Sequence, residues 1–150
     1  PDYRKPQDGA GVCGLSWCHG APGIGLARLG GLGIHADADT MAEIEAALTT
    51  TAGTDLQAID GLCCGNLGHA EFMLAAGLRL DRPALRDNAA RRVAQVVGRA
   101  RATAGYDFLG PQVPQVPGGH PGFFQGESGV GYTLLRLARP DLCPSVLLFE

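Results

Sequence analysis

The chain has 150 residues, of which 45% are hydrophobic, and this size and composition suit one globular domain with a sizeable core. The formal net charge is -3, so the chain lacks the strong basic field that attracts nucleic acid or an anionic membrane, and neither is expected as a partner. The apolar runs are too short to cross a bilayer and no secretory signal opens the chain, so we expect a cytoplasmic protein.

Residues 1–11 are polar and rich in turn-forming residues, which is typical of a connection between elements. The chain also starts at Pro1 without an initiating methionine. We therefore expect residues 1–150 to be the C-terminal part of a longer protein, with upstream elements of the same domain missing.

Glycine turns recur three times along the chain. Each has the pattern G-x-x-G followed by an apolar stretch, and the first glycines are Gly20, Gly65 and Gly126. The sequences are CHGAPGIGLARL at 18–29, CCGNLGHAEFML at 63–74 and FQGESGVGYTLLRL at 124–137. Because each stretch is apolar on most sides, we predict short buried helices after the turns.

The segments between the turns are predicted to be amphipathic helices. Residues 40–49 open with Thr40 and Glu43 in a capping-box pattern, and residues 83–102 follow Asp81, which is a suitable N-cap. In the second segment an apolar stripe lies opposite most of the arginines. This pattern favours a solvated basic face over a binding surface for an acidic leader peptide.

Few segments indicate strands, and the proline-rich residues 113–119 are expected to form a loop. Buried and amphipathic helices that alternate, joined by glycine turns on one face, predict an inner and an outer ring of helices. The fold class is therefore all-α, an α/α toroid of which about three sectors are present.

Three of the five cysteines stand just before a glycine turn: Cys18 before the first, and Cys63 and Cys64 before the second. Adjacent cysteines rarely pair, because a disulfide needs Cα atoms about 4.4–6.8 Å apart and a trans peptide separates them by about 3.8 Å. A helix start stabilises a thiolate, so we expect lowered pKa values at these thiols. Three converging thiolates suit zinc and leave its fourth position open, as in a catalytic site, although the spacing alone also allows buried free thiols.

The charge of such a site favours one kind of chemistry. Zinc with three thiolates carries one net negative charge, and a substrate thiolate adds a second, so the ion is a poor Lewis acid for activating water. The same ion keeps a bound thiolate deprotonated and nucleophilic. Thiol alkylation is therefore favoured over hydrolysis.

The motifs SWCHGAPGIGLARL, GLCCGNLG, GFFQGESGVGYTLLRL and PSVLLFE together resemble the C-terminal part of the LanC-like cyclase domain of class II, LanM-type lanthipeptide synthetases. The resemblance runs from about residue 12 to the end of the chain. It implies an α/α toroid with a zinc ion held by Cys18, Cys63 and Cys64. It also implies addition of cysteine thiols to dehydroalanine or dehydrobutyrine in a precursor peptide, which forms lanthionine or methyllanthionine.

In the family that the chain resembles, the proton step involves a histidine and an acid upstream of the first cysteine motif, which this chain does not match. Within the chain, His19 is the candidate catalytic residue, to orient a ligand or to assist proton transfer, and simple positioning of the turn is the alternative. His69 is expected to be a hydrogen-bonded histidine on an inner helix. His35 and His120 are expected in exposed loops.

Four further side chains near the motifs have expected roles. Trp17 is expected to pack beneath the first turn, and Gln125 to shape the third. Cys13 and Cys143 match no motif, so both are expected to be small buried residues.

Two other functions remain as alternatives. A non-catalytic module would keep the metal and bind peptides or thiols without turnover. An α/α toroid glycosidase would need two carboxylates facing the ring mouth, for which Glu71 and Glu127 are the acids close to the turns. The glycosidase leaves the cysteines unexplained.

Overall fold

The computed structural model describes residues 14–109 and 119–150. Within these ranges the chain forms five α-helices, one short 3-10 helix and no strand. The helices are α1 (Ala21–Gly31), α2 (Ala38–Ala52), α3 (Asn66–Arg79), α4 (Pro83–Thr103), α5 (Glu127–Ala138) and η1 (Val146–Leu148). The predicted all-α class is confirmed, and the arrangement is consistent with part of an α/α toroid. Apart from Gly119, the loop predicted at 113–119 lies outside the described residues.

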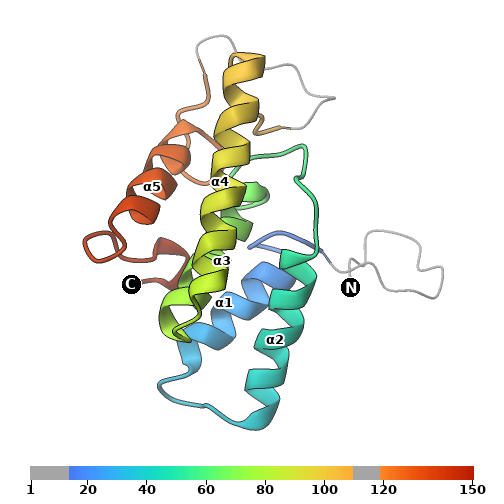
Figure 1. The fold of residues 1–150 in the computed structure, drawn as a ribbon, viewed down its shortest axis with the longest axis vertical. Helices are drawn as coiled ribbons and strands as arrows, with labels where there is room; N and C mark the ends of the chain where they lie inside the picture. Colours follow the sequence, from blue (N-terminus) through green and yellow to red (C-terminus); the bar gives the residue numbers. More distant parts are fainter. Residues whose placement is uncertain (1–13, 110–118) are drawn as a thin grey trace, which may run out of the picture.

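Helix α3 is the central element of the fold. It packs against α4, α1 and α5, while α1 also packs against α2 (Figure 1). Every α3 residue from Asn66 to Gly77 is buried, as expected for a helix surrounded by other elements. Gly25 of α1 lets the two helices approach closely, because a Cβ there would lie 2.1 Å from the buried ring of Phe72.

Helices α1 and α5 are less buried than their sequences predict. Ile24 of α1 is 54% exposed, and Leu135 of α5 is 64% exposed. The prediction of buried helices after all three turns is therefore correct for α3 and wrong for one side of α1 and α5. The physical reason is position, because α3 has neighbours on several sides and no described element covers these flanks of α1 and α5.

Both predicted outer helices form, and α4 begins at Pro83 as predicted, but the residues that cap the two helices differ from the prediction. Helix α2 begins at Ala38, and the Asp37 side chain caps it by accepting a hydrogen bond from the Thr40 N–H at 2.7 Å. Thr40 therefore lies inside the helix and is not its cap. Helix α4 begins after Arg82, while Asp81 takes a left-handed conformation with φ of 50°.

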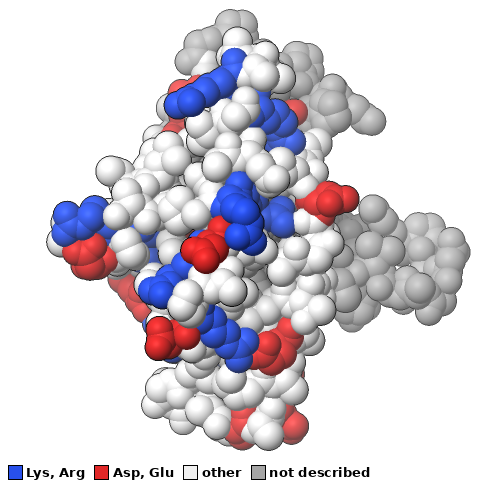
Figure 2. Space-filling model, viewed as in Figure 1, with Lys and Arg blue, Asp and Glu red and all other residues white. Residues whose placement is uncertain are grey.

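Helix α4 buries the predicted apolar stripe, including Ala89, Val93 and Val96. Arginine side chains follow its outer face, with acidic groups among them (Figure 2). The prediction is wrong for Arg92, which is buried because its guanidinium donates to the carbonyl oxygen of Thr54 at 2.6 Å. None of the helices in the described ranges is both long and apolar enough to span a membrane.

Candidate metal centre

The three glycine turns share one backbone geometry. In each turn the first glycine is the N-cap of the helix that follows, namely Gly20 for α1, Gly65 for α3 and Gly126 for α5. The N–H of the first helical residue donates to a carbonyl seven positions earlier, from Ala21 to Gly14 at 3.0 Å, from Asn66 to Ile59 at 3.0 Å and from Glu127 to His120 at 2.7 Å. The repeated sequence pattern therefore produces a repeated fold of the loop.

The second glycine of each turn is required by close backbone approach. A Cβ added there would lie about 2 Å from the carbonyl oxygen of the residue six positions earlier. The distances would be 1.8 Å from Gly23 to Trp17, 2.4 Å from Gly68 to Leu62 and 2.0 Å from Gly129 to Phe123. Real Cβ atoms do not approach an oxygen this closely, so a side chain at these positions displaces the loop that precedes the helix.

Backbone hydrogen bonds join the three turns to one another. The Trp17 N–H donates to the Cys63 carbonyl at 2.8 Å, and the Cys63 N–H donates to the Phe124 carbonyl at 2.9 Å. This ladder places the first turn beside the second and the second beside the third. Side chains that precede the first glycines are thus brought to one place.

The sulfur atoms of Cys18, Cys63 and Cys64 meet at this place. The Sγ atoms of Cys18 and Cys64 are 3.5 Å apart, those of Cys63 and Cys64 are 3.3 Å apart, and all three lie within 4.8 Å of one another. Cys18 is exposed, while Cys63 and Cys64 are half-buried, and none of the three forms a disulfide. The structure therefore brings together the three thiols that the sequence analysis selected.

This donor set fits a tetrahedral zinc ion. With Zn–S bonds of about 2.3 Å, tetrahedral geometry places sulfur ligands about 3.8 Å apart, close to the separations found here. Thiolates also suit zinc better than they suit magnesium or calcium, which prefer oxygen ligands. The three cysteines could hold the ion from one side and leave a fourth position for another ligand.

The thiols differ in acidity. Burial acts to raise the pKa of Cys18, but hydrogen bonds from Cys63, Cys64 and Ser16 outweigh it and hold the pKa of this thiol below its usual value. Burial raises the pKa of Cys63 and of Cys64, and the neighbouring Cys18 raises both further. The expected lowering of the pKa is thus correct for Cys18 and wrong for the other two. The reason is first that burial disfavours a thiolate, and second that one thiolate in a small cluster disfavours the next, a repulsion that a bound cation would remove.

Aromatic and polar side chains surround the cluster. The rings of Trp17 and Phe124 stack with centroids 5.4 Å apart, so Trp17 packs against the third turn. The amide of Gln125 lies with its nitrogen 3.8 Å from the sulfur of Cys64. Sequence reasoning did not assign Phe124 to the site, although its place two residues before Gly126 matches that of Cys63 before Gly65.

The histidines take separate roles. His69 is fully buried on α3, and its Nε2–H donates to the carbonyl of Leu15, which ties α3 to the first turn. Burial lowers the pKa of His69, so the imidazole is neutral, and the predicted structural role is confirmed. His35 is exposed and pairs with Asp37, whereas His120 is half-buried, so the expected exposure is correct only for His35.

The remaining candidates lie near the ends of the described segments. His19 is exposed, and its backbone N–H donates to the Ser16 carbonyl at 3.2 Å within the first turn. Cys143 is half-buried rather than buried, and its carbonyl accepts a hydrogen bond from the side chain of Arg136. Cys13 lies outside the described residues.

The acids near the turns do not form a carboxylate pair at the thiols. Glu71 is fully buried and accepts from Arg136 and from Ser145, each at 2.7 Å. Glu127 is exposed and lines a cavity that lies apart from the thiols. This arrangement gives no support to the glycosidase alternative.

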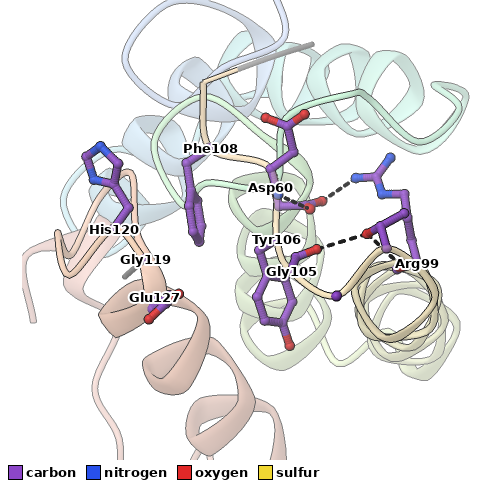
Figure 3. Close-up of a pocket in the computed structure, with 11 residues that line it drawn as sticks. Asp60, Arg99, Gly105, Tyr106, Phe108, Gly119, His120 and Glu127 are labelled. Carbon is purple, nitrogen blue, oxygen red and sulfur yellow. Dashed lines mark hydrogen bonds and ion pairs between the residues drawn. The ribbon is translucent and has the colours of Figure 1, made fainter. Parts of the chain in front are cut away.

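That cavity, of about 550 Å³, lies between the end of α4 and the start of α5. Figure 3 shows Arg99 directed at Asp60 on one side, with His120 and Glu127 on the other. Asp60 also accepts hydrogen bonds from the Asn66 side chain and the Asp107 N–H, so its carboxylate is engaged in holding the loop. The cavity contains none of the cysteines, and two of its charged side chains, Arg99 and Asp60, already pair with each other.

The fold and the thiols indicate the class of this protein. It is a helical ring segment whose glycine turns carry a cysteine cluster that could bind a metal ion. The family model for lanthionine synthetase C-like protein matches residues 1–148, and the chain belongs to this family. Comparisons with curated proteins and with solved structures found no match.

Proposed function

We propose that the chain is part of a zinc-dependent cyclase of the class II, LanM type, which joins peptide cysteines to dehydroalanine or dehydrobutyrine. The observation that carries this proposal is the meeting of three thiols within 4.8 Å at the glycine turns of a lanthionine synthetase C-like chain. The partner is a precursor peptide with cysteine and dehydrated serine or threonine. Upstream residues of the same synthetase are proposed to complete the ring.

Cys18, Cys63 and Cys64 would hold the ion, and the backbone ladder between the turns orients them. Zinc, when bound, would supply the charge that keeps a substrate cysteine as a thiolate at neutral pH. The Gln125 amide is placed to donate to the sulfur of Cys64, which offsets part of the negative charge of the cluster.

The bond changes define what else the protein must supply. The substrate sulfur bonds to the β-carbon of the dehydro residue, the Cα=Cβ π bond breaks, and its electron pair delocalises into the adjacent carbonyl as an enolate. The α-carbon then takes a proton, so the thiol and the alkene become a thioether without any oxidant. His19 is our candidate for delivering this proton, because it follows Cys18 directly and its side chain is exposed to a peptide.

Metal analysis of single cysteine variants tests the ligand set. The purified chain should contain about one zinc, and Cys63→Ala or Cys64→Ala should weaken zinc binding more than about a hundredfold. Cys143→Ala is the matched control, because Cys143 is also half-buried but lies outside the cluster, and it should keep the metal. Full zinc retention in both cluster variants would contradict the proposed ligand set.

Cyclisation of a dehydrated peptide by the zinc-loaded protein tests His19. A general acid contributes about 10²–10⁴-fold to the rate, so His19→Ala should lower turnover by that amount and leave the zinc content unchanged. An unchanged rate would show that His19 only positions the turn.

A further inference from the structure

A second cavity, of about 540 Å³, adjoins the thiol cluster at Cys18. Its walls are Trp17, the side of α1 and the C-terminal segment, including Leu148 and Phe149. Apart from Cys18, every side chain that lines it is apolar or a glycine. The volume lies within the range of about 300–1,000 Å³ that is usual for ligand pockets. The thiol cluster and an apolar cavity therefore share one residue, Cys18.

The C-terminal wall holds an exposed aromatic ring in place. Phe149 is 85% exposed and has a left-handed backbone with φ of 59°, which is uncommon for a bulky residue. Its N–H donates to the Val146 carbonyl at 3.2 Å, and the Glu150 side chain forms an ion pair with Arg79 of α3. The ring of Phe149 lies 6.2 Å from that of Trp17, centroid to centroid, so both rings border the cavity.

Hydrogen bonds to two helices hold this wall in place. The Ser145 hydroxyl donates to the buried carboxylate of Glu71, and Tyr132 of α5 both donates to the Pro144 carbonyl and accepts from the Val146 N–H. The segment before Phe149 is therefore anchored on α3 and on α5. An anchored segment that presents an exposed ring beside an apolar cavity has the character of a binding surface.

Small residues of α1 keep the cavity open. Gly23, Ala27 and Gly30 line it and recur every three or four positions, so they share one face of the helix. Gly23 is needed by the turn, but Gly30 is not crowded, because the nearest atom to a Cβ there would be 3.6 Å away on Leu148. Packing alone would therefore allow an alanine at this position.

We propose that this cavity binds an apolar side chain of the peptide substrate, on the residue next to the cysteine that docks at the thiols. The proposal rests on the proposed function, because the docked cysteine brings its neighbour to Cys18. Consecutive Cα atoms are about 3.8 Å apart, so the next side chain reaches a cavity that Cys18 itself lines. No charged side chain lines the cavity. Burial of an acidic side chain there would therefore cost desolvation free energy that no ion pair offsets.

Tryptophan fluorescence of the zinc-loaded full chain tests the proposal, because Trp17 is its single tryptophan and lines the cavity. The probes are end-blocked Gly-Cys-Leu-Gly, Gly-Cys-Gly-Gly and Gly-Cys-Glu-Gly. The leucine peptide should bind about tenfold more tightly than the glycine peptide, as burial of part of a leucine side chain predicts. The glutamate peptide should bind more weakly than either.

Two variants with matched controls locate the preference in this cavity. Ala27→Leu fills the cavity and should abolish the leucine preference, whereas Ala42→Leu, at an exposed position of α2 outside the cavity, should preserve it. Phe149→Ala should reduce the preference about threefold. Ile34→Ala is its control, because Ile34 is also exposed but does not line the cavity.

The outcomes separate this proposal from the proposed function. Equal affinities for the leucine and glycine peptides, with zinc bound and cysteine required, would overturn the apolar subsite alone. A leucine preference that survives in Gly-Ser-Leu-Gly would break the link between cavity and thiols and so overturn the subsite as a substrate site. Failure of the chain to bind zinc in the same preparation would count against the proposed function instead.

Discussion

The first two glycine turns and the third have the same backbone geometry but different side chains. All three cap a helix with glycine and accept the first helical N–H on a carbonyl seven residues earlier. The first two present Cys18, Cys63 and Cys64, whereas the third presents Phe124 and Gln125. The turn is therefore a scaffold that positions whichever residues precede its first glycine, and the chemistry depends on those residues.

The helices that follow the turns are also attached differently. Helix α1 meets α3 through apolar packing, the close approach of Gly25 to Phe72 and a hydrogen bond from the Arg79 side chain to the Leu29 carbonyl at 2.6 Å. Helix α5 is tied to α3 by the buried ion pair of Arg136 with Glu71. Helix α5, which follows the third turn, thus supports the C-terminal segment, while the first two turns carry the thiols.

The largest expected effect comes from breaking the attachment of α5. Arg136→Met leaves the Glu71 carboxylate buried without its partner, which should lower the free energy of unfolding by about 3–5 kcal/mol in urea titration. Adding Glu71→Gln should recover at least half of this loss. Arg139→Met is the control, because the ion pair of Arg139 with Asp141 is exposed, and little change is expected. Equal effects of the two arginine variants would contradict a special role of the buried pair.

Disrupting the close backbone approach that the three turns share should have the next largest effect on stability. Gly68→Ala places a Cβ against the Leu62 carbonyl and should cost about 2–4 kcal/mol of unfolding free energy. A Cβ added at Gly98 of α4 would meet open space, so Gly98→Ala should stabilise the protein by about 0.5–1 kcal/mol. Thermal melting of both variants checks this, and similar shifts in the same direction would disprove the steric account.

The pH dependence of zinc binding sharpens the difference between the turns. The raised pKa values of Cys63 and Cys64 mean that both thiols keep their protons near neutral pH, and zinc must displace them. Apparent zinc affinity should therefore rise with pH, by up to about a hundredfold per unit when two protons are released. Chelator competition between pH 6.5 and 8 measures the slope, and an affinity independent of pH would contradict the release of protons from Cys63 and Cys64 on zinc binding.

The smallest effect concerns the contribution of the third turn to the cluster. Gln125→Ala removes an amide whose nitrogen is 3.8 Å from the sulfur of Cys64, a long contact that should change zinc affinity less than about threefold. If Gln125→Ala lowered zinc affinity as much as Cys64→Ala does, Gln125 would belong to the metal centre itself rather than to its edge.

Much of the fold was predictable because its signals are local. The apolar stripe of α4, including Val93 and Val96, follows from helical spacing and is buried as predicted. The caps of α2 and α4 were misassigned, because Asp37 caps α2 in place of Thr40, and Asp81 is left-handed, so Arg82 takes the N-cap position of α4. Several residues can cap one helix, and only the final backbone path selects among them.

The candidate site was predictable to the extent that its residues occur in motifs. Cys18, Cys63 and Cys64 stand before repeated glycines, and the fold brings their sulfurs together. The stacking of Trp17 on Phe124 joins segments more than a hundred residues apart in the sequence, which no local pattern encodes. The same holds for Arg92, whose burial depends on carbonyl groups of the loop after α2.

By itself the sequence determined the repeated turns, the alternation of helices and the three thiols that precede the turns. Local steric rules suffice for these features, because glycine spacing and apolar periodicity act over a few residues. Only the tertiary structure decided that Cys63 and Cys64 have raised pKa values and that Phe149 and Trp17 border a cavity beside Cys18. Burial and contact between distant segments determine both, and these arise only when the helices pack around α3.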